Sequence, residues 1–207
     1  KIHYIKKIPN AIPYVVSYYK KDWGFCMSYN KFKKLSKGTY KVVINSKFKK
    51  GSMTYADILI KGKLKKEILL TTYTCHPSMG NNETSGISLL SFLGEYLQKL
   101  SRERKLNFSY RIVFHPENIG AIAYINKNLS KLKKNVIAGY VITCVGDNKT
   151  YSYLKSKEEN SLSNRAALNI LKNNYKKFEI YEFTKSGSDE RRYNAPGVNL
   201  PIGSLMR

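Results

Sequence analysis

The pattern of apolar and polar residues changes near residue 65, and its two parts predict different structures. In the first part, short apolar segments alternate with turns and cover residues 14–19, 24–28, 39–44 and 54–60. Tyr40, Val42 and Ile44 follow a two-residue period, which is typical of a strand with one face on a core. We therefore predict that residues 1–64 form a small, mainly β portion, either inserted or lid-like.

From residue 65 onward, apolar runs alternate with amphipathic segments. Strands are predicted at residues 67–75, 107–115, 136–145, 151–154, 178–183 and 198–205, and helices at residues 84–100, 118–128 and 162–175. The first helix places Leu90, Leu93 and Leu97 on one face, and Asn81 or Asn82 is available as its N-cap. Strands that alternate with helices predict a largely parallel sheet that is covered on both faces.

The predicted fold class is therefore α/β. Residues 65–207 are expected to form a three-layer α/β/α core around a central mixed, largely parallel sheet. In such sheets ligands bind at the carboxyl ends of the strands.

Composition supports a globular protein and excludes several other classes. The chain has 207 residues, of which 42% are hydrophobic and 25% charged, so it is neither disordered nor collagen-like. Its apolar runs are much shorter than the ~20 residues of a membrane-spanning helix, so we expect no membrane insertion. Cys26, Cys75 and Cys144 are widely spaced and include no CxxC pair, which favours reduced thiols and a cytoplasmic location.

The charge is strongly basic and unevenly distributed. The net charge is +23, and residues 1–66 carry seventeen lysines but only two acids, Asp22 and Asp57. Such a segment suggests nucleic-acid binding. However, thirty of the basic residues are Lys and seven are Arg, whereas phosphate- and base-reading surfaces favour Arg. Nucleic-acid binding through residues 1–64 is therefore the weaker alternative, and a lysine-rich solvated surface explains the charge better.

Side chains that can bind a metal or transfer a proton lie where the long strands of the α/β part end. They are His76 after the first strand, His115 and Glu117 at the second, Asp147 after the third, Asn82 and Glu83 in the first turn, and Ser188, Asp189 and Glu190 before the last strand. Each also has an ordinary explanation, such as a helix first turn for Glu83 or a turn for Asp147. Their coincidence at successive strand ends favours a site for a dication such as Zn²⁺, which takes nitrogen and oxygen ligands.

Several motifs around these residues resemble a known family. They are YTCHPSMGNNETSG at residues 73–86, PENIGA at 116–121, TCVGD at 143–147, GSDERRY at 187–193 and PGVNLPIGSLMR at 196–207. In this order they resemble a bacterial aminopeptidase-like domain family, some members of which occur near polysaccharide-biosynthesis genes. That family is similar to the zinc aminopeptidases and glutamate carboxypeptidases, which have a mixed sheet between helices and two zinc ions. The resemblance therefore implies a zinc-exopeptidase-like fold.

The resemblance also assigns roles to individual residues. It makes His76, Glu117 and Asp147 metal ligands, and it places the segment of Ser188, Asp189 and Glu190 along the wall of the site. Asn82 stands where the related enzymes have a carboxylate that bridges both metals. Because an amide oxygen is a weak neutral ligand, Glu83 is the candidate to replace that carboxylate.

Two further departures from the pattern affect the expected chemistry. Pro116 precedes Glu117 where the related enzymes have a pair of glutamates, so His115 becomes a candidate general base beside Glu117. The family continues past residue 207 to a His that completes the metal site. We therefore expect the sequence to be a piece of a longer protein, with an incomplete site for one or two zinc ions.

The leading hypothesis is a zinc-dependent aminopeptidase-like hydrolase that acts on a peptide or amide bond, with Glu117 or His115 as the base. The alternative is a catalytically degenerate member of the same fold that serves as a binding or structural protein, with a link to surface polysaccharide biosynthesis. Neither the natural substrate nor the oligomeric state follows from the sequence.

Overall fold

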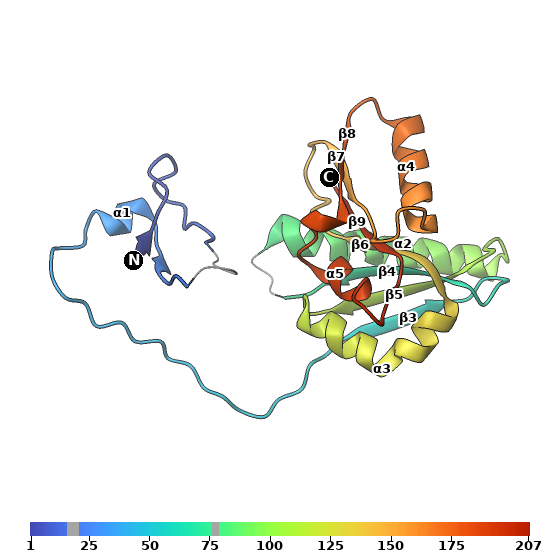
Figure 1. Ribbon diagram of the computed structural model, residues 1–207, viewed down its shortest axis with the longest axis horizontal. Helices are drawn as coiled ribbons and strands as arrows, with labels where there is room; N and C mark the ends of the chain where they lie inside the picture. The colour runs from blue at the N-terminus through green and yellow to red at the C-terminus, as the bar shows by residue number, and fades with distance from the viewer. Residues whose placement is uncertain (16–20, 76–78) are drawn as a thin grey trace. The chain divides into compact units, whose positions relative to one another are not determined.

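The computed structural model describes residues 1–15, 21–75 and 79–207. The chain divides into two compact units, Lys1–Lys50 and Gly51–Arg207, and each is described by itself (Figure 1). Most of the strand predicted at residues 14–19 lies outside the described residues, as does His76.

The first unit has little regular structure. β1 (Ile2–His3) pairs in parallel with β2 (Phe25–Cys26), and the single-turn helix α1 (Tyr29–Phe32) follows. The Ser28 hydroxyl accepts a hydrogen bond from the Lys31 amide and so caps α1.

The prediction of a strand at residues 39–44 is wrong. These residues have no regular secondary structure, and Val43 and Ile44 are 73% and 74% exposed. A two-residue period stabilises a strand only when one face is buried and a neighbouring strand supplies hydrogen bonds. The alternation was present here, but a buried face was not.

The second unit is built on one seven-stranded sheet with the order β3-β5-β4-β6-β9-β7-β8. The strands are β3 (Ala56–Ile60), β4 (Glu67–Tyr73), β5 (Ser109–His115), β6 (Val136–Ile142), β7 (Tyr151–Leu154), β8 (Phe178–Tyr181) and β9 (Ile202–Met206). Strands β5, β4, β6 and β9 run parallel, whereas β3 and β7 run antiparallel to β5 and β9. The predicted mixed, largely parallel sheet is confirmed.

Strand β3 belongs to the second unit, so the boundary between the two units lies earlier in the chain than we predicted. We placed the boundary between residues 64 and 65, but the compact units divide between Lys50 and Gly51. The reason is that β3 pairs along its whole length with β5, from Ala56 opposite Phe114 to Ile60 opposite Tyr110. An edge strand far away in sequence from its partner carries no local sign of which unit it joins.

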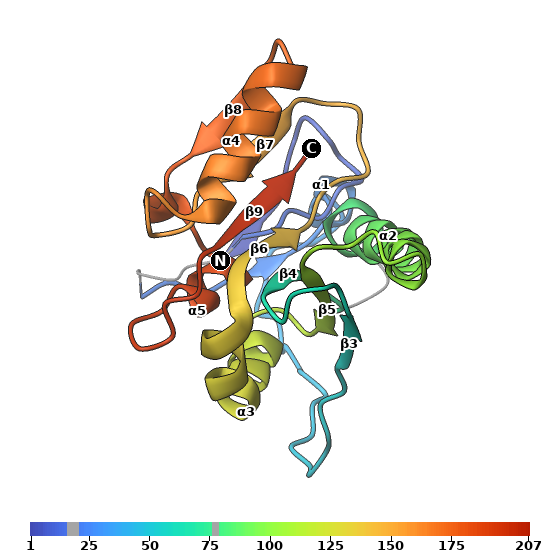
Figure 2. The ribbon, with the colours of Figure 1, turned by 90° about the vertical axis from the view of Figure 1, so that its right-hand side faces the viewer.

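Helices cover both faces of the sheet, as predicted. They are the helical turn η1 (Gly80–Thr84), α2 (Ser85–Arg102), α3 (Ile119–Asn135), α4 (Leu162–Asn174), the short turn η2 (Phe183–Lys185) and α5 (Asp189–Tyr193). α2 and α4 pack on one face, where both of their clusters include Tyr140 and Leu205, and α3 and α5 pack on the other (Figure 2). α3 continues past the predicted end at residue 128.

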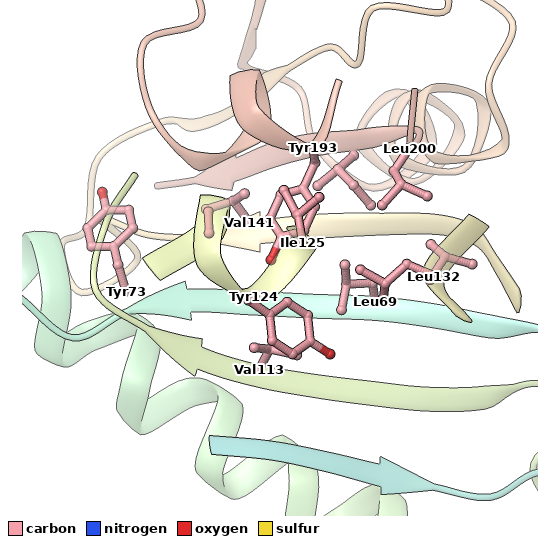
Figure 3. Packing of buried hydrophobic residues seen from close by; sticks show 12 residues of the cluster. Leu69, Tyr73, Val113, Tyr124, Ile125, Leu132, Val141, Tyr193 and Leu200 are labelled. Carbon is pink, nitrogen blue, oxygen red and sulfur yellow. The ribbon is translucent and has the colours of Figure 1, made fainter. Parts of the chain in front are cut away.

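The core under α3 and α5 is the largest buried cluster. Leu69, Val113 and Val141 project from three neighbouring strands toward Tyr124 of α3 and Tyr193 of α5 (Figure 3). All five side chains are fully buried. This packing fixes α5 against the sheet, and α5 begins with Asp189, one of the predicted site residues.

Among the described residues, no helix is both long and apolar enough to cross a bilayer.

An ion cluster built on the buried Glu67 and Arg111 lies toward the amino ends of β4 and β5. It consists of Asp57, Glu67 and Arg111. Arg111 Nε lies 2.6 Å from one Glu67 carboxylate oxygen, and Arg111 Nη1 lies 2.5 Å from Asp57 Oδ1. The Tyr124 hydroxyl donates to the other Asp57 oxygen at 2.8 Å. The guanidinium therefore contacts both carboxylates, and each carboxylate accepts a further hydrogen bond.

Candidate active site

The sheet order brings three loops to one edge. β5, β4 and β6 are neighbours and run parallel, so the segments that follow them leave the sheet at the same edge. These segments contain Cys75, Glu117 and Asp147. α5 adds Asp189, which is the first residue of that helix. The sheet order therefore brings these strand-end residues to one edge, although their contacts divide them into separate groups.

One group is the acidic cluster, which consists of Glu117, Ser188 and Asp189. The Ser188 hydroxyl donates to Glu117 Oε1 at 2.5 Å, and Asp189 Oδ1 accepts from the Asn118 amide at 2.7 Å. Asn118 has a φ of 57°, a left-handed conformation that is uncommon for a residue other than glycine. Backbone strain of this kind is often found at functional sites, where the surrounding contacts maintain it.

Asp189 is the most perturbed carboxylate of this cluster. Its side chain is fully buried, and Oδ2 is one of the few buried oxygens in the described part of the chain without a hydrogen-bond partner. The pKa of Asp189 is raised to about 7, chiefly by burial and also by the nearby Glu117 and Glu190, while the Asn118 amide and Arg192 oppose the shift. An unpartnered buried carboxylate oxygen is costly unless a proton or a cation satisfies it.

His115 lies in the core beneath the acidic cluster. Its ring is fully buried, with Nε2 3.1 Å from the Thr71 hydroxyl and 3.0 Å from the Tyr193 hydroxyl. Nδ1 lies 3.1 Å from the Pro116 carbonyl oxygen and 3.7 Å from Asp189 Oδ2. Because a carbonyl oxygen only accepts, Nδ1 carries the proton and Nε2 is the acceptor.

This environment changes what His115 can do. Burial lowers the pKa of the imidazole and favours its neutral form. A general base must reach the proton that it removes, directly or through one water molecule. The imidazole has no exposed surface and both nitrogens contact protein groups, so the geometry supports a positioning role beside Asp189 rather than the role of base that the sequence suggested.

Cys75 joins the ends of β4 and β5. Its sulfur accepts a hydrogen bond from the Glu117 amide at 3.1 Å, and its side chain is exposed. Burial raises the pKa of the Cys75 thiol, and the Glu117 amide opposes that shift. The sequence analysis predicted only a reduced thiol for this cysteine. The structure places it beside the candidate catalytic carboxylate.

A second group, the amide cluster, contains Tyr73, Asn82 and Thr143. The Tyr73 hydroxyl donates to Asn82 Oδ1 at 2.7 Å and lies 2.7 Å from the Thr143 hydroxyl. The Thr143 hydroxyl also lies 2.8 Å from the Asn82 carbonyl oxygen, to which it can donate. The Asn82 side chain, which the resemblance places where a bridging carboxylate is expected, is therefore held by neutral hydroxyls. Glu83, the candidate replacement, is 3% exposed.

Asp147 and Glu190 have partners of their own. Asp147 accepts hydrogen bonds from Asn81 Nδ2 at 3.1 Å and from the Lys149 amide at 2.9 Å, which makes it part of the turn after β6. Glu190 Oε1 accepts from the amides of residues 187 and 188, and Oε2 accepts from the Ser204 hydroxyl. Glu190 therefore holds the loop that presents Ser188.

The donor set fits a zinc site only in part. Across residues 1–15, 21–75 and 79–207, no three His, Cys, Asp or Glu side chains lie close enough together to hold a metal ion. The acidic cluster nevertheless offers carboxylate donors and one buried oxygen without a partner. This chemistry suits a dication, and a complete set requires ligands in addition to those that the described residues bring together.

Several residues of the site were missed by the sequence analysis. Thr71, Tyr73, Thr143 and Tyr193 supply the hydroxyls that hold His115 and Asn82. The signal available was a run of polar residues at the end of otherwise apolar strands, as in residues 71–74. Such a run indicates an unusual strand end, but it does not identify the partner of each hydroxyl.

The sequence matches the model of a family described as a domain of unknown function, DUF4910, over residues 6–207. A Clostridium acetobutylicum protein, described as a candidate polysaccharide biosynthesis protein with an aminopeptidase-like domain, is 44% identical over 206 residues, which cover 100% of this chain and 46% of that protein. The crystal structure of a candidate peptidase from Clostridium acetobutylicum is 42% identical with a TM-score of 0.79, and the match covers 100% of this chain and 48% of that one. The chain therefore spans about half the length of these relatives.

A zinc aminopeptidase from Bacillus subtilis has the same fold. The match has a TM-score of 0.56 at 12% identity and covers 73% of this chain and 38% of that one. At this identity the likeness concerns the fold alone. It confirms the zinc-exopeptidase-like architecture that the sequence motifs implied.

Proposed function

We propose that this chain, which belongs to the DUF4910 family and has an aminopeptidase-like fold, is part of a zinc-dependent hydrolase that acts on a peptide or amide bond. The observation that carries the proposal is the acidic cluster at the carboxyl ends of the parallel strands. There Ser188 orients Glu117, and the neighbouring Asp189 keeps a buried oxygen without a partner. A buried carboxylate oxygen without a hydrogen bond destabilises the folded chain, and such groups are expected at catalytic or binding sites.

The residues proposed to hold zinc are His76 and Asp147, with Asn82 and Glu83 near the position of a second ion. The resemblance also makes Glu117 a ligand, but one carboxylate serves one role, and Glu117 is proposed here as the base. When bound, zinc polarises the scissile carbonyl and lowers the pKa of a bound water molecule. His76 lies outside the described residues, so its part in the proposal rests on the sequence motif.

The chain's own residues supply positioning and proton transfer. The Ser188 hydroxyl fixes one oxygen of Glu117, and Glu117 is the residue that accepts a proton from the attacking water. Asp189 holds the amide of Asn118, the residue that follows Glu117, and so fixes the direction of the loop. His115 supports this arrangement from below through Asp189, the Pro116 carbonyl and two hydroxyls.

A second candidate is a catalytically degenerate protein that binds a ligand with the same strand-end edge. The observation that favours it is the amide cluster, in which a neutral Asn82 accepts from Tyr73 where a bridging carboxylate would be needed. The name of the Clostridium relative associates this alternative with polysaccharide biosynthesis. It predicts ligand binding without stoichiometric zinc.

Metal removal separates the two candidates. We expect the zinc-loaded protein to hydrolyse members of a panel of aminoacyl p-nitroanilides, to lose this activity in a chelator, and to recover it when zinc is added back. Circular dichroism before and after chelation checks that the fold survives the treatment. Hydrolysis that persists in the chelator, or a protein that neither binds zinc nor hydrolyses any amide, would contradict the proposal.

A further inference from the structure

An uncharged cavity lies at the same edge of the sheet as the acidic cluster. Its volume is about 600 Å³, within the range of small-molecule pockets, roughly 300–1,000 Å³. The lining includes Met53, Tyr55, Phe114 and Ile119, and none of its residues is charged. This absence of charge on the wall is notable in a chain with a net charge of +23.

The wall of this cavity continues directly into the candidate active site. Thr74 and Pro116 line the cavity, and the next residues in the chain are Cys75 and Glu117. Consecutive Cα atoms are about 3.8 Å apart across a trans peptide bond, so the cavity begins one residue away from the proposed base. The hydrogen bond from the Glu117 amide to the Cys75 sulfur holds these two loops together.

Two of the lining residues are held in place by the fold. Ala56, which follows Tyr55, pairs with Phe114 in the register of β3 and β5. The Tyr55 ring packs edge-on against Tyr124 with centroids 5.4 Å apart, and Lys127 Nζ lies 5.5 Å from the centre of the same ring. The opposite side is open, because Ile119 is 66% exposed and Met53 is 40% exposed.

From this geometry we infer that the cavity binds a large apolar side chain of the substrate, next to the bond that is cleaved. The inference rests on the proposed function and adds a substrate class to it, namely peptides or amides with a leucine-, methionine- or phenylalanine-like group. Apolar side chains gain from leaving water for this uncharged wall. A lysine side chain would lose hydration there, and none of the lining residues carries a charge to pair with it.

Binding of aminoacyl amides tests the inference without requiring catalysis. Leucinamide, glycinamide and lysinamide are titrated into protein labelled at its methionine and isoleucine methyl groups, and NMR shifts are followed at Met53 and Ile119. We expect leucinamide to shift both signals and to bind at least about tenfold more tightly than glycinamide or lysinamide. Equal affinity for the three amides, or shifts confined to other methyl groups, would overturn the inference.

A matched pair of variants on α3 isolates the cavity. Ile119→Lys adds a charge to the wall, and Ile122→Lys adds the same charge one turn away, at a residue that is 52% exposed and does not line this cavity. We expect Ile119→Lys to remove the preference for leucinamide and Ile122→Lys to retain it. A preference that survives Ile119→Lys would overturn the inference.

Hydrolysis rates distinguish failure of this inference from failure of the proposed function. A kcat/KM for leucine p-nitroanilide that is at least about tenfold higher than that for lysine p-nitroanilide supports both the inference and the proposed function. Selective binding of leucinamide without hydrolysis of any amide supports the cavity and contradicts the proposed function. Hydrolysis with no preference for apolar residues supports the proposed function and overturns the inference.

Discussion

The two ends of strands β4 and β5 carry buried charges in opposite conditions. Toward the amino ends, both carboxylates of the ion cluster of Asp57, Glu67 and Arg111 contact the same guanidinium. At the carboxyl ends, Asp189 of the acidic cluster has an oxygen without a hydrogen-bond partner and a raised pKa. The same strands therefore hold one charge group that is satisfied by the protein and one that is not.

This difference separates stability from function. A buried charge that is paired and hydrogen-bonded is compatible with a purely structural role. A carboxylate that the fold buries without satisfying requires another explanation, and a site for a proton or a cation provides one. The left-handed Asn118, beside Glu117, adds strain at the same end of the sheet. The contrast leads to predictions that differ between the two clusters.

The largest expected effect is on activity at the carboxyl ends. Glu117→Gln keeps an acceptor for the Ser188 hydroxyl but cannot accept a proton, so hydrolysis should fall by about 10²- to 10⁴-fold. The free energy of unfolding should change by less than about 1 kcal/mol. Steady-state rates and urea denaturation measure the two quantities. Glu95→Gln, at an exposed position on α2, is the control, and an equal loss in both variants would refute the role of Glu117.

The largest effect on stability is expected at the ion cluster. Arg111→Met leaves the buried Glu67 and the partly exposed Asp57 without their cation, and breaking a buried pair such as Arg111–Glu67 costs about 3–5 kcal/mol. Urea denaturation should show this loss. A second variant that also carries Asp57→Asn and Glu67→Gln should recover part of it, because no buried charge then remains. If Arg111→Met alone were as stable as wild type, the charges of the ion cluster would not stabilise one another.

Asp189→Asn should change the free energy of unfolding by less than Arg111→Met does, and in the stabilising direction. This effect should depend on pH. Because the folded chain raises the pKa of Asp189 from 3.8 to about 7, it binds the proton more tightly than the unfolded chain does. The stability of wild type should therefore fall, relative to the variant, as the pH rises from about 4 to about 7. Denaturation in a chelator at both ends of this range measures the difference. A difference that is constant across the range would contradict the raised pKa.

The smallest expected effect concerns the link between the two strand ends. Cys75→Ala removes the acceptor of the Glu117 amide, which costs about 0.5–1.5 kcal/mol, toward the lower end because Cys75 is exposed. Cys75→Ser retains an acceptor and should lose less. Thermal denaturation of the two variants ranks them, and a larger loss in Cys75→Ser would show that the hydrogen bond contributes nothing.

The fold was largely predictable from the sequence because apolar periodicity reports burial. β4, β5 and β6 lie within predicted strands, and α2 and α4 match predicted helices within a few residues. Periodicity does not identify partners. It therefore produced a strand at residues 39–44 that has no buried face, and it assigned β3 to the wrong part of the chain.

The candidate site was predictable in position but not in detail. Residues at the ends of neighbouring parallel strands must lie at one edge, which is why Glu117 and Asp147 could be expected there, although their contacts divide them into separate groups. Whether a side chain faces the edge or the core depends on packing by distant residues. Tyr193 and Thr71 enclose His115, and no local pattern around His115 indicates either of them.

The most direct test of the central claim is zinc per chain, measured by elemental analysis of wild type and of His76→Ala. The proposed hydrolase predicts one or two zinc ions per wild-type chain, a clear loss in the variant, and a parallel loss of amide hydrolysis. Wild type without zinc, or equal zinc in the two proteins, would contradict a metal site at the carboxyl ends of these strands.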